Sequence, residues 1–393
     1  MKKTLLAAAL IVGFAGVAQA ETSVTLYGIL DGGIGYQQVK NMPKVGIYNT
    51  TVNPVTGAVT RTRIGTTASK ATKFGLIDGV QSGNRWGMKG TEDLGNGLRA
   101  VFQLESGFGL RDGNQGQGGR LFGRQATLGL ASDAWGQLDV GRQTNVASKY
   151  FPGIADPFGA SFGQANGGTS FTNANTVRYD NMIMYQTPNF SGFQFGLGYS
   201  FNTNGSQQWN VADSNVNQTA ITTGIRYANG PIGLVATYDR ISTKDAPDGL
   251  GGSEKQSFQS YSLGGSYDFE VVKLHLGFGQ TKDGVFQGQG MPLDNVVSLG
   301  GNTYFDGLKF NSYIAGVSAP LGNGKIMASW QMADPTSEPT GVDLDKQQVY
   351  SIGYTYNLSK RTNVYAIGSY AKNAAMIDGV KSTLVGVGMR HQF

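Results

Sequence analysis

The sequence contains no cysteine, and only two of its 393 residues are histidine. The absence of cysteine excludes disulfide scaffolds, thiolate metal sites and cysteine nucleophiles. Two histidines leave little scope for histidine-based metal ligation or for a catalytic triad. A P-loop, an EF-hand loop and a His-x-x-x-His pair are also missing. The composition therefore argues against an enzyme, and we expect neither a metal site nor a cofactor.

Charge is scarce as well, because only 15% of the residues are charged and the formal net charge is +5. No run of Lys and Arg occurs, so a nucleic-acid partner is not expected. Glycine is abundant, at 60 residues, but it has no three-residue period and there are only 11 prolines, which excludes collagen. A hydrophobic content of 39% argues against disorder.

The N-terminus has the pattern of a secretory signal peptide. Lys2 and Lys3 precede an apolar stretch at 5–17, and the small residues Ala18 and Ala20 frame a cleavage site. A membrane anchor is the alternative, but the apolar stretch is short and no stop-transfer charges follow it. We therefore predict a signal peptide at 1–20, cleavage after Ala20, and a single barrel domain at 21–393 with a net charge of +3.

After the leader, no window approaches eighteen apolar residues, and alternation with a period of two dominates. At 192–203, for example, Phe193, Phe195 and Leu197 interleave with Gln194 and Gly196. Successive side chains of a strand point to opposite faces, so one face is apolar and the other is small or polar. Few Lys or Glu residues occupy the second face, which favours a membrane barrel with a polar interior over a soluble sandwich.

We count about sixteen such strands, and their connections alternate between short and long. The long stretches are 39–83, 144–177 and 284–306. Short turns at one end and long loops at the other are typical of an outer-membrane barrel. The predicted fold is an all-β, 16-stranded antiparallel transmembrane barrel. The predicted strands are 23–38, 84–90, 97–109, 121–132, 135–143, 178–187, 192–203, 216–228, 231–242, 256–269, 271–283, 307–319, 324–334, 346–358, 361–373 and 381–393. For 361–373 the pattern leaves open which face meets lipid.

Several segments resemble the general porins of Gram-negative bacteria. They are RWGMKGTEDLGNGL at 85–98, LFGRQA at 121–126, NFSGF at 189–193, NLSKRT at 357–362 and VGMRHQF at 387–393. The resemblance implies a homotrimer of barrels in the outer membrane, each with a water-filled pore for ions and small hydrophilic solutes. It also implies that the third long loop, 144–177, folds into the pore.

Strand parity places Arg85, Arg99, Arg178, Glu105 and Asp31 on the inner face, and the resemblance implies that Arg124 occupies the family's basic wall position. In the family, a wall of arginines opposes acidic residues on the inner loop, which here carries only the charges Lys149 and Asp156. Because acids are few, we expect a weak preference for anions. The predicted basic wall is Arg85, Arg99, Arg124, Arg178 and, by its position beside the third loop, Arg142. The predicted acidic side is Asp156, Glu105 and Asp31.

The last strand ends with an apolar stripe that includes Phe393. The resemblance implies that such an ending is recognised by the barrel-assembly machinery, and that lipopolysaccharide and other outer-membrane lipids surround the barrel. A substrate-selective channel for phosphate or sugar is the alternative function. It requires a ladder of basic residues or an aromatic slide along the pore, which the sequence does not establish.

Overall fold

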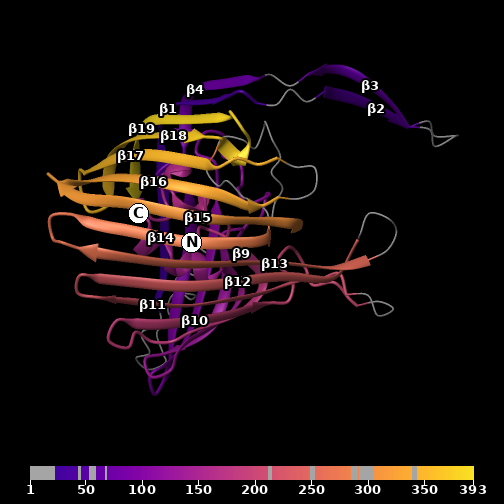
Figure 1. Ribbon diagram of the computed structural model, residues 1–393. Helices are drawn as coiled ribbons and strands as arrows, with labels where there is room; N and C mark the ends of the chain where they lie inside the picture. Colours follow the sequence, from indigo (N-terminus) through magenta and orange to yellow (C-terminus); the bar gives the residue numbers. More distant parts are fainter. Residues whose placement is uncertain are drawn as a thin grey trace, which may run out of the picture.

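Period-two segments become strands that form one closed ring (Figure 1). The computed structural model describes residues 23–42, 46–52, 59–66, 69–210, 215–247, 253–284, 291, 304–338 and 343–393, so the predicted signal peptide lies outside the described residues. The strands are β1 (Ser23–Lys40), β2 (Gly46–Val52), β3 (Val59–Thr66), β4 (Lys70–Asp78), β5 (Arg85–Gly95), β6 (Leu98–Gly107), β7 (Gln125–Ser132), β8 (Gly136–Thr144), β9 (Arg178–Gln186), β10 (Phe193–Ser200), β11 (Gln218–Asn229), β12 (Ile232–Pro247), β13 (Ser253–Asp268), β14 (Lys273–Gly284), β15 (Tyr304–Leu321), β16 (Gly324–Ser337), β17 (Gln347–Asn357), β18 (Thr362–Lys372) and β19 (Lys381–Gln392).

The ring closes where β1 pairs antiparallel with β19, from Ile29 opposite Gln392 to Lys40 opposite Lys381. β4 and β5 both pair with β1, one after the other, and together they occupy a single place in the ring. The barrel therefore has sixteen strand positions, as predicted, and backbone hydrogen bonding leaves no open edge in lipid.

Two strand assignments were incomplete. β4 lies inside the stretch 39–83 that was expected to be a loop. It was missed because the irregular segment 79–84 separates it from β5, the next strand. β2 and β3, from the same stretch, pair only with each other. The predicted strand 121–132 begins later, at Gln125.

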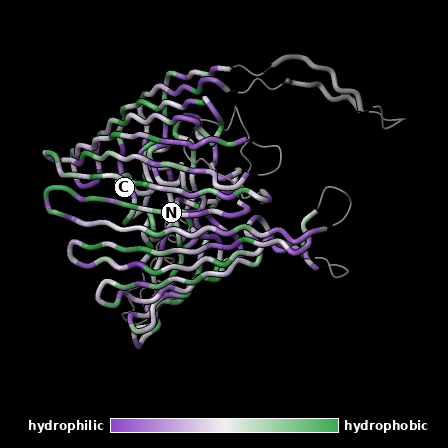
Figure 2. Tube along the Cα trace, viewed as in Figure 1, coloured by the Kyte–Doolittle hydropathy of each residue, from purple (hydrophilic) through white to green (hydrophobic). Residues whose placement is uncertain are grey.

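Exposure confirms the predicted inversion of the two faces. The side chains of Leu26, Leu197 and Leu276 are 61%, 47% and 61% exposed on the outside of the ring. Hydrophobic residues recur along the strands in Figure 2 and give way to hydrophilic ones toward the long loops. On β18 the open question is settled, since Val364 faces outward and Tyr365 is buried inside. Among the described residues, no helix has the length and apolar character needed to cross a bilayer.

The third long loop folds into the barrel. Between β8 and β9 it forms the helices α2 (Val146–Tyr150) and α3 (Pro152–Ala155) and two 3-10 turns, η1 (Gly163–Ala165) and η2 (Gly167–Thr169). Inward side chains of distant strands hold it. Gln331 of β16 donates to the Ala165 carbonyl at 2.7 Å, Gln347 of β17 donates to the Thr169 carbonyl at 3.0 Å, and Ser382 of β19 donates to Gln164 Oε1 at 2.6 Å.

The helices of this loop lie on glycines of the barrel wall. A Cβ on Gly264 of β13 would stand 2.6 Å from the Cβ of Ala155, and one on Gly277 of β14 would stand 2.8 Å from the Phe151 ring. Phe151 and Ala155 are fully buried in a cluster that joins the loop to the wall. Glycine is therefore required at these positions because loop and backbone come into direct contact.

Candidate pore constriction

The loop covers one side of the interior and leaves the other side open. Its contacts fall on β10 to β19, for instance where His275 of β14 meets the Ile154 carbonyl at 2.8 Å and where Ser312 of β15 donates to the Ser170 carbonyl at 2.7 Å. The wall made of β1 and β5 to β8 instead borders a polar pocket of about 250 Å³. Its lining includes Lys89, Gln103, Thr127 and Asp139. We call the space between the loop and this wall the passage.

A bonded group of side chains on this wall centres on Glu105. Arg124 Nε lies 2.7 Å from Glu105 Oε1, and the Tyr27 hydroxyl donates to Glu105 Oε2 at 3.0 Å. Lys89 lies over the Tyr27 ring, 5.7 Å from its centre. The carboxylate is thus held in place by one cation and one hydroxyl, with a second cation nearby.

Two further arginines adjoin this group. Arg178 Nε donates to the Arg124 carbonyl at 2.8 Å, and Arg85 Nε donates to the Gly83 carbonyl at 2.9 Å. Arg85 and Arg178 are the first residues of β5 and β9, and Arg124 directly precedes β7. These strands run in the same direction, and each begins after an irregular segment or a long loop. The fold therefore brings together three arginines that are far apart in the sequence.

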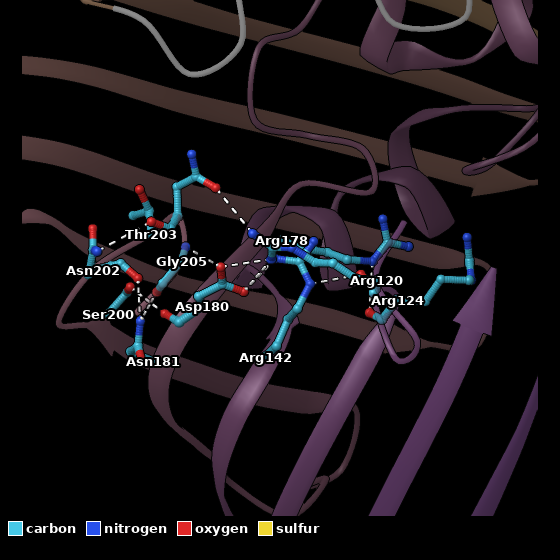
Figure 3. A network of polar contacts seen from close by, with 12 residues as sticks. Arg120, Arg124, Arg142, Arg178, Asp180, Asn181, Ser200, Asn202, Thr203 and Gly205 are labelled. Carbon is cyan, nitrogen blue, oxygen red and sulfur yellow. Dashed lines mark hydrogen bonds and ion pairs between the residues drawn. The ribbon is translucent and has the colours of Figure 1, made fainter. Parts of the chain in front are cut away.

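Arg142 belongs to the network of polar contacts in Figure 3, which also includes Arg124 and Arg178. Its Nη1 lies 2.6 Å from Asp180 Oδ1, and Arg120 Nη1 lies 2.8 Å from Asp180 Oδ2. A register shift between Gly141 and Gln143 and the left-handed backbone of Asn181 interrupt strand parity here. Asp180 therefore binds Arg142 and Arg120, the second of which the sequence analysis did not select.

Arg99 lies apart from the other predicted wall residues. It pairs with Asp133 of the short turn between β7 and β8, at 2.7 Å, and both side chains are solvent-exposed. Arg99 is six residues from Glu105 along β6, about 20 Å in an extended strand. The structure does not bring it to the arginine group.

Asp156, the expected acidic partner on the loop, points into the loop itself. Its carboxylate accepts the backbone N–H groups of Phe158 at 2.8 Å and Gly167 at 2.7 Å, and it is buried. Burial raises the pKa of Asp156 to about 7, although these hydrogen bonds oppose the rise. The loop therefore directs no carboxylate at the arginines, and Lys149 is its one partly exposed charge.

Replacing Asp156 with alanine should leave ion selectivity unchanged and make the channel close at a lower voltage. The substitution removes the acceptor for two buried N–H groups, at a cost of about 1–3 kcal/mol for each group left unpaired. It removes no charge that faces the passage. Reversal potential and closing voltage in planar bilayers measure the two effects, with Asp156→Asn as the control that retains an acceptor. A shift of the reversal potential in both variants would contradict this prediction and show that Asp156 lines the pore.

Asp31 is also placed differently from the expectation. It is fully buried, and its carboxylate accepts hydrogen bonds from the Tyr365 hydroxyl at 2.7 Å and from the Ser82 N–H at 2.6 Å. Asp31 therefore holds the irregular segment 79–84 in place before β5. Opposite it in the ladder stands Arg390 of β19, which the sequence analysis missed. Val385 and Met389 of the same strand are exposed on the outer face, so the alternation of side chains places Arg390 inside.

Phe393 lies in the closing seam, the contact between β1 and β19 that closes the ring. Its N–H donates to the Gly28 carbonyl at 3.2 Å and its carbonyl accepts the Gly28 N–H at 3.1 Å. The Phe393 ring covers Gly28, where a Cβ would meet the ring at 2.2 Å, and remains 46% exposed on the outer face. The terminal residue therefore joins the two ends of the sheet.

Comparison with known proteins agrees with this architecture. A family model described as Gram-negative porin matches residues 7–375. An outer membrane porin protein of Bordetella pertussis is 54% identical, with 100% of both chains covered, and outer membrane porin protein 32 of Delftia acidovorans is 31% identical, also with 100% of both covered. The solved structure of an anion-selective porin from Comamonas acidovorans has a TM-score of 0.67 and 29% identity, covering 95% of this chain and 100% of that one. The chain belongs to the Gram-negative porin family of the outer membrane.

Proposed function

We propose that this porin is a general diffusion channel that passes ions and small hydrophilic solutes and prefers anions. The observation that supports it is the imbalance of charge along the passage. Arg124 is paired with Glu105, whereas no ion pair among the described residues includes Arg85, Arg178 or Lys149. Fixed positive charges on a low-dielectric wall raise the local concentration of anions.

The arginines suit this role because their positions are fixed and their charge is permanent. Backbone carbonyls hold Arg85 and Arg178, which leaves other guanidinium N–H groups available to an anion. Hydrated solutes can exchange water for these donors without a conformational change. An apolar solute gains nothing from them and must still displace the ordered water.

The remaining features of the proposal are taken from what is typical of the porin family. We propose a homotrimer in the outer membrane, removal of the leader after Ala20, and recognition of the strand ending in Phe393 by the barrel-assembly machinery. Lipopolysaccharide is the proposed lipid partner on the outside. One of the solved structures with the same fold is described as a trimer form, and the Comamonas porin as anion-selective.

Planar-bilayer recording of the purified native oligomer tests the proposal. In a salt gradient the reversal potential should lie on the anion side, and conductance should appear in groups of three equal steps. A cation-side potential would contradict the assigned selectivity. The alternative, a substrate-selective channel, requires that liposome swelling favour one solute strongly over others of equal size, whereas a general porin should rank solutes by size.

A further inference from the structure

A pocket of polar side chains lies beside the arginine group of Arg85, Arg124 and Arg178, toward the short-turn end of the barrel. It is the pocket of about 250 Å³ that the wall of β1 and β5 to β8 borders. Gln103, one of its residues, is two positions from Glu105 along β6, which is about 7 Å in an extended strand. Both side chains face inward, because strand residues two apart share a face. A solute that moves from the arginines toward the short-turn end therefore meets this pocket next.

Two opposite charges occupy the two ends of this pocket without pairing. Lys89 of β5 is exposed at one end. Asp139 of β8 is buried at the other end, and its carboxylate leans over the adjacent strand, since a Cβ on Gly129 of β7 would stand 2.3 Å from Asp139 Oδ1. No ion pair among the described residues includes Lys89 or Asp139. Because β6 lies between β5 and β7, the two charged groups are about two strand spacings apart, or about 9.6 Å.

The other charges around Asp139 do not neutralise it. Lys149 of the inner loop is affected by it, because burial lowers the pKa of Lys149 and the negative charge of Asp139 opposes that change. The described residues nevertheless include no ion pair between the two, and Lys149 does not line the pocket. Glu105, in contrast, is paired directly with Arg124 at 2.7 Å. Asp139 is thus an acid on the wall of the passage that the proposed preference for anions does not explain.

Two glutamines of the pocket have amide oxygens without partners, because their nitrogen atoms are already used. Gln137 Nε2 donates to Asp139 Oδ1 and Oδ2, both at 2.9 Å, and an ionised carboxylate only accepts, which fixes the orientation of this amide. Gln103 Nε2 donates to the Tyr27 hydroxyl, whose own proton goes to Glu105. In the part of the chain that the structure describes, no hydrogen bond has Oε1 of Gln103 or of Gln137 as its acceptor. Together with the Asp139 carboxylate, these oxygens favour a ligand group that is positively charged and donates several hydrogen bonds.

The opposite end of the pocket offers donors. The Lys89 ammonium carries three N–H groups, and no carboxylate occupies them. In the strand ladder Thr25 of β1 stands directly opposite Lys89. The hydroxyls of Ser23 and Thr91, which are also opposite each other, line the pocket on the same side. An ammonium group with hydroxyls beside it suits a carboxylate, so the pocket has a cationic donor end and an anionic acceptor end.

We propose that this pocket binds a zwitterionic α-amino acid as it crosses the barrel, with the carboxylate at Lys89 and the ammonium at Asp139 and Gln137. An α-amino acid carries both charges on one carbon, through bonds of about 1.5 Å, so its charged groups are about 3 Å apart. A charge-assisted hydrogen bond of about 2.8 Å at each end extends this to about 9 Å, which matches the separation of the two ends. A simple anion is repelled by Asp139, and a simple cation by Lys89. The inference rests on the proposed function, in which hydrophilic solutes cross the passage.

The test is single-channel recording of the purified oligomer with L-alanine, L-lactate or L-alaninamide in the bath. These probes share a carbon skeleton, but lactate has a hydroxyl in place of the ammonium, and alaninamide has a neutral amide in place of the carboxylate. We expect alanine to reduce the ion current in a saturable manner. Asp139→Asn should raise the half-saturating concentration of alanine about tenfold and should not weaken the effect of lactate. Lys89→Gln should raise it about tenfold and should not weaken the effect of alaninamide, because each variant removes one charge-assisted contact.

The chain offers a matched control for the loss of a negative charge alone. Asp133 lies in the short turn between β7 and β8, where it is exposed and pairs with Arg99 at 2.7 Å. It does not line the pocket. Asp133→Asn should therefore change the half-saturating concentration of alanine by less than about twofold. Heat-stable trimer on gels shows that each variant is folded, and Lys89→Gln, at an exposed position, tests the site even where Asp139→Asn lowers the yield of trimer.

Equal weakening of alanine by Asp139→Asn and Asp133→Asn would overturn the proposal, as would no effect of Lys89→Gln. A current that glycerol reduces as strongly as alanine would also overturn it, because glycerol carries neither charge. If alanine has no saturable effect on an open channel with an anion-side reversal potential, the amino-acid site is wrong and the proposed function stands. A wild-type channel that does not conduct, or that has a cation-side potential, would instead contradict the proposed function.

Discussion

Replacing Arg85 and Arg124 with glutamine will shift the reversal potential toward cations and leave the channel open. Both guanidinium groups stand on the wall that faces the passage, and the substitutions keep side chains of similar length. Removing Arg124 also frees Glu105, which then keeps only the Tyr27 hydroxyl as its partner. The lining therefore loses two positive charges and exposes one negative charge.

The expected effect is large because it combines three charges. A unit charge 4 Å from an ion is worth about 1 kcal/mol in bulk water and about 4 kcal/mol at an effective dielectric constant of 20. Even the lower value corresponds to about a fivefold change in the local concentration of an anion, with the opposite change for a cation. The change in permeability ratio should shrink in 1 M salt, where the Debye length is about 3 Å.

Arg99→Gln is the matched control, because Arg99 is solvent-exposed and already paired with Asp133. Reversal potentials of wild type, the Arg85/Arg124 variant and the control in the same salt gradient give the comparison. If the control shifted the potential as much as the double variant, selectivity would reside in the lumen charge as a whole and not at the arginine group. An unchanged potential in the double variant would contradict the assignment of the constriction.

Deleting Phe393 should reduce the yield of folded trimer far more than it changes conductance. The deletion removes both backbone hydrogen bonds to Gly28 and the ring that covers it. Unpaired backbone groups in hydrocarbon cost several kcal/mol each. Trimer that does form should conduct normally, because Phe393 lies on the outer face, away from the passage.

Heat-stable trimer on gels, from cells and from refolding in detergent, measures the effect and separates its two causes. A defect in cells alone indicates recognition by the assembly machinery, and a defect in both indicates the closing seam. Leu358→Ala serves as the control, since Leu358 is another exposed apolar side chain, 58% accessible, in a short turn. Normal yield from the deletion in both settings would exclude either role for Phe393.

The barrel itself could be predicted from the sequence because lipid outside and water inside impose the alternation at every strand. Leu197 illustrates this, since the alternation at 192–203 assigned it to the apolar face and it is exposed on the outside of the ring. The same argument reached Arg85 and Glu105, whereas Arg124 came from the resemblance to the family. The same alternation could have identified Arg390 as an inward-facing residue, because its neighbour Met389 and Val387 face outward.

What parity could not predict depends on breaks in the regular strand or on the fold of the inner loop. β4 was missed because the strand is interrupted at 79–84, and Asp180 was not selected because a bulge at Asn181 interrupts the alternation there. Asp156 was placed on the pore because the resemblance implies acidic residues on the inner loop, and Asp156 is the one acid in 144–177. Its hydrogen bonds to Phe158 and Gly167 turn it inward instead, and no local pattern in the sequence indicates that.

The direct contact of Ala155 and Phe151 with Gly264 and Gly277 separates two tasks within one chain. The outer cylinder meets the membrane and its neighbours, whereas an insert resting on bare backbone sets the width of the bore. Substitutions in the insert can change the calibre of the channel without altering any surface that contacts lipid.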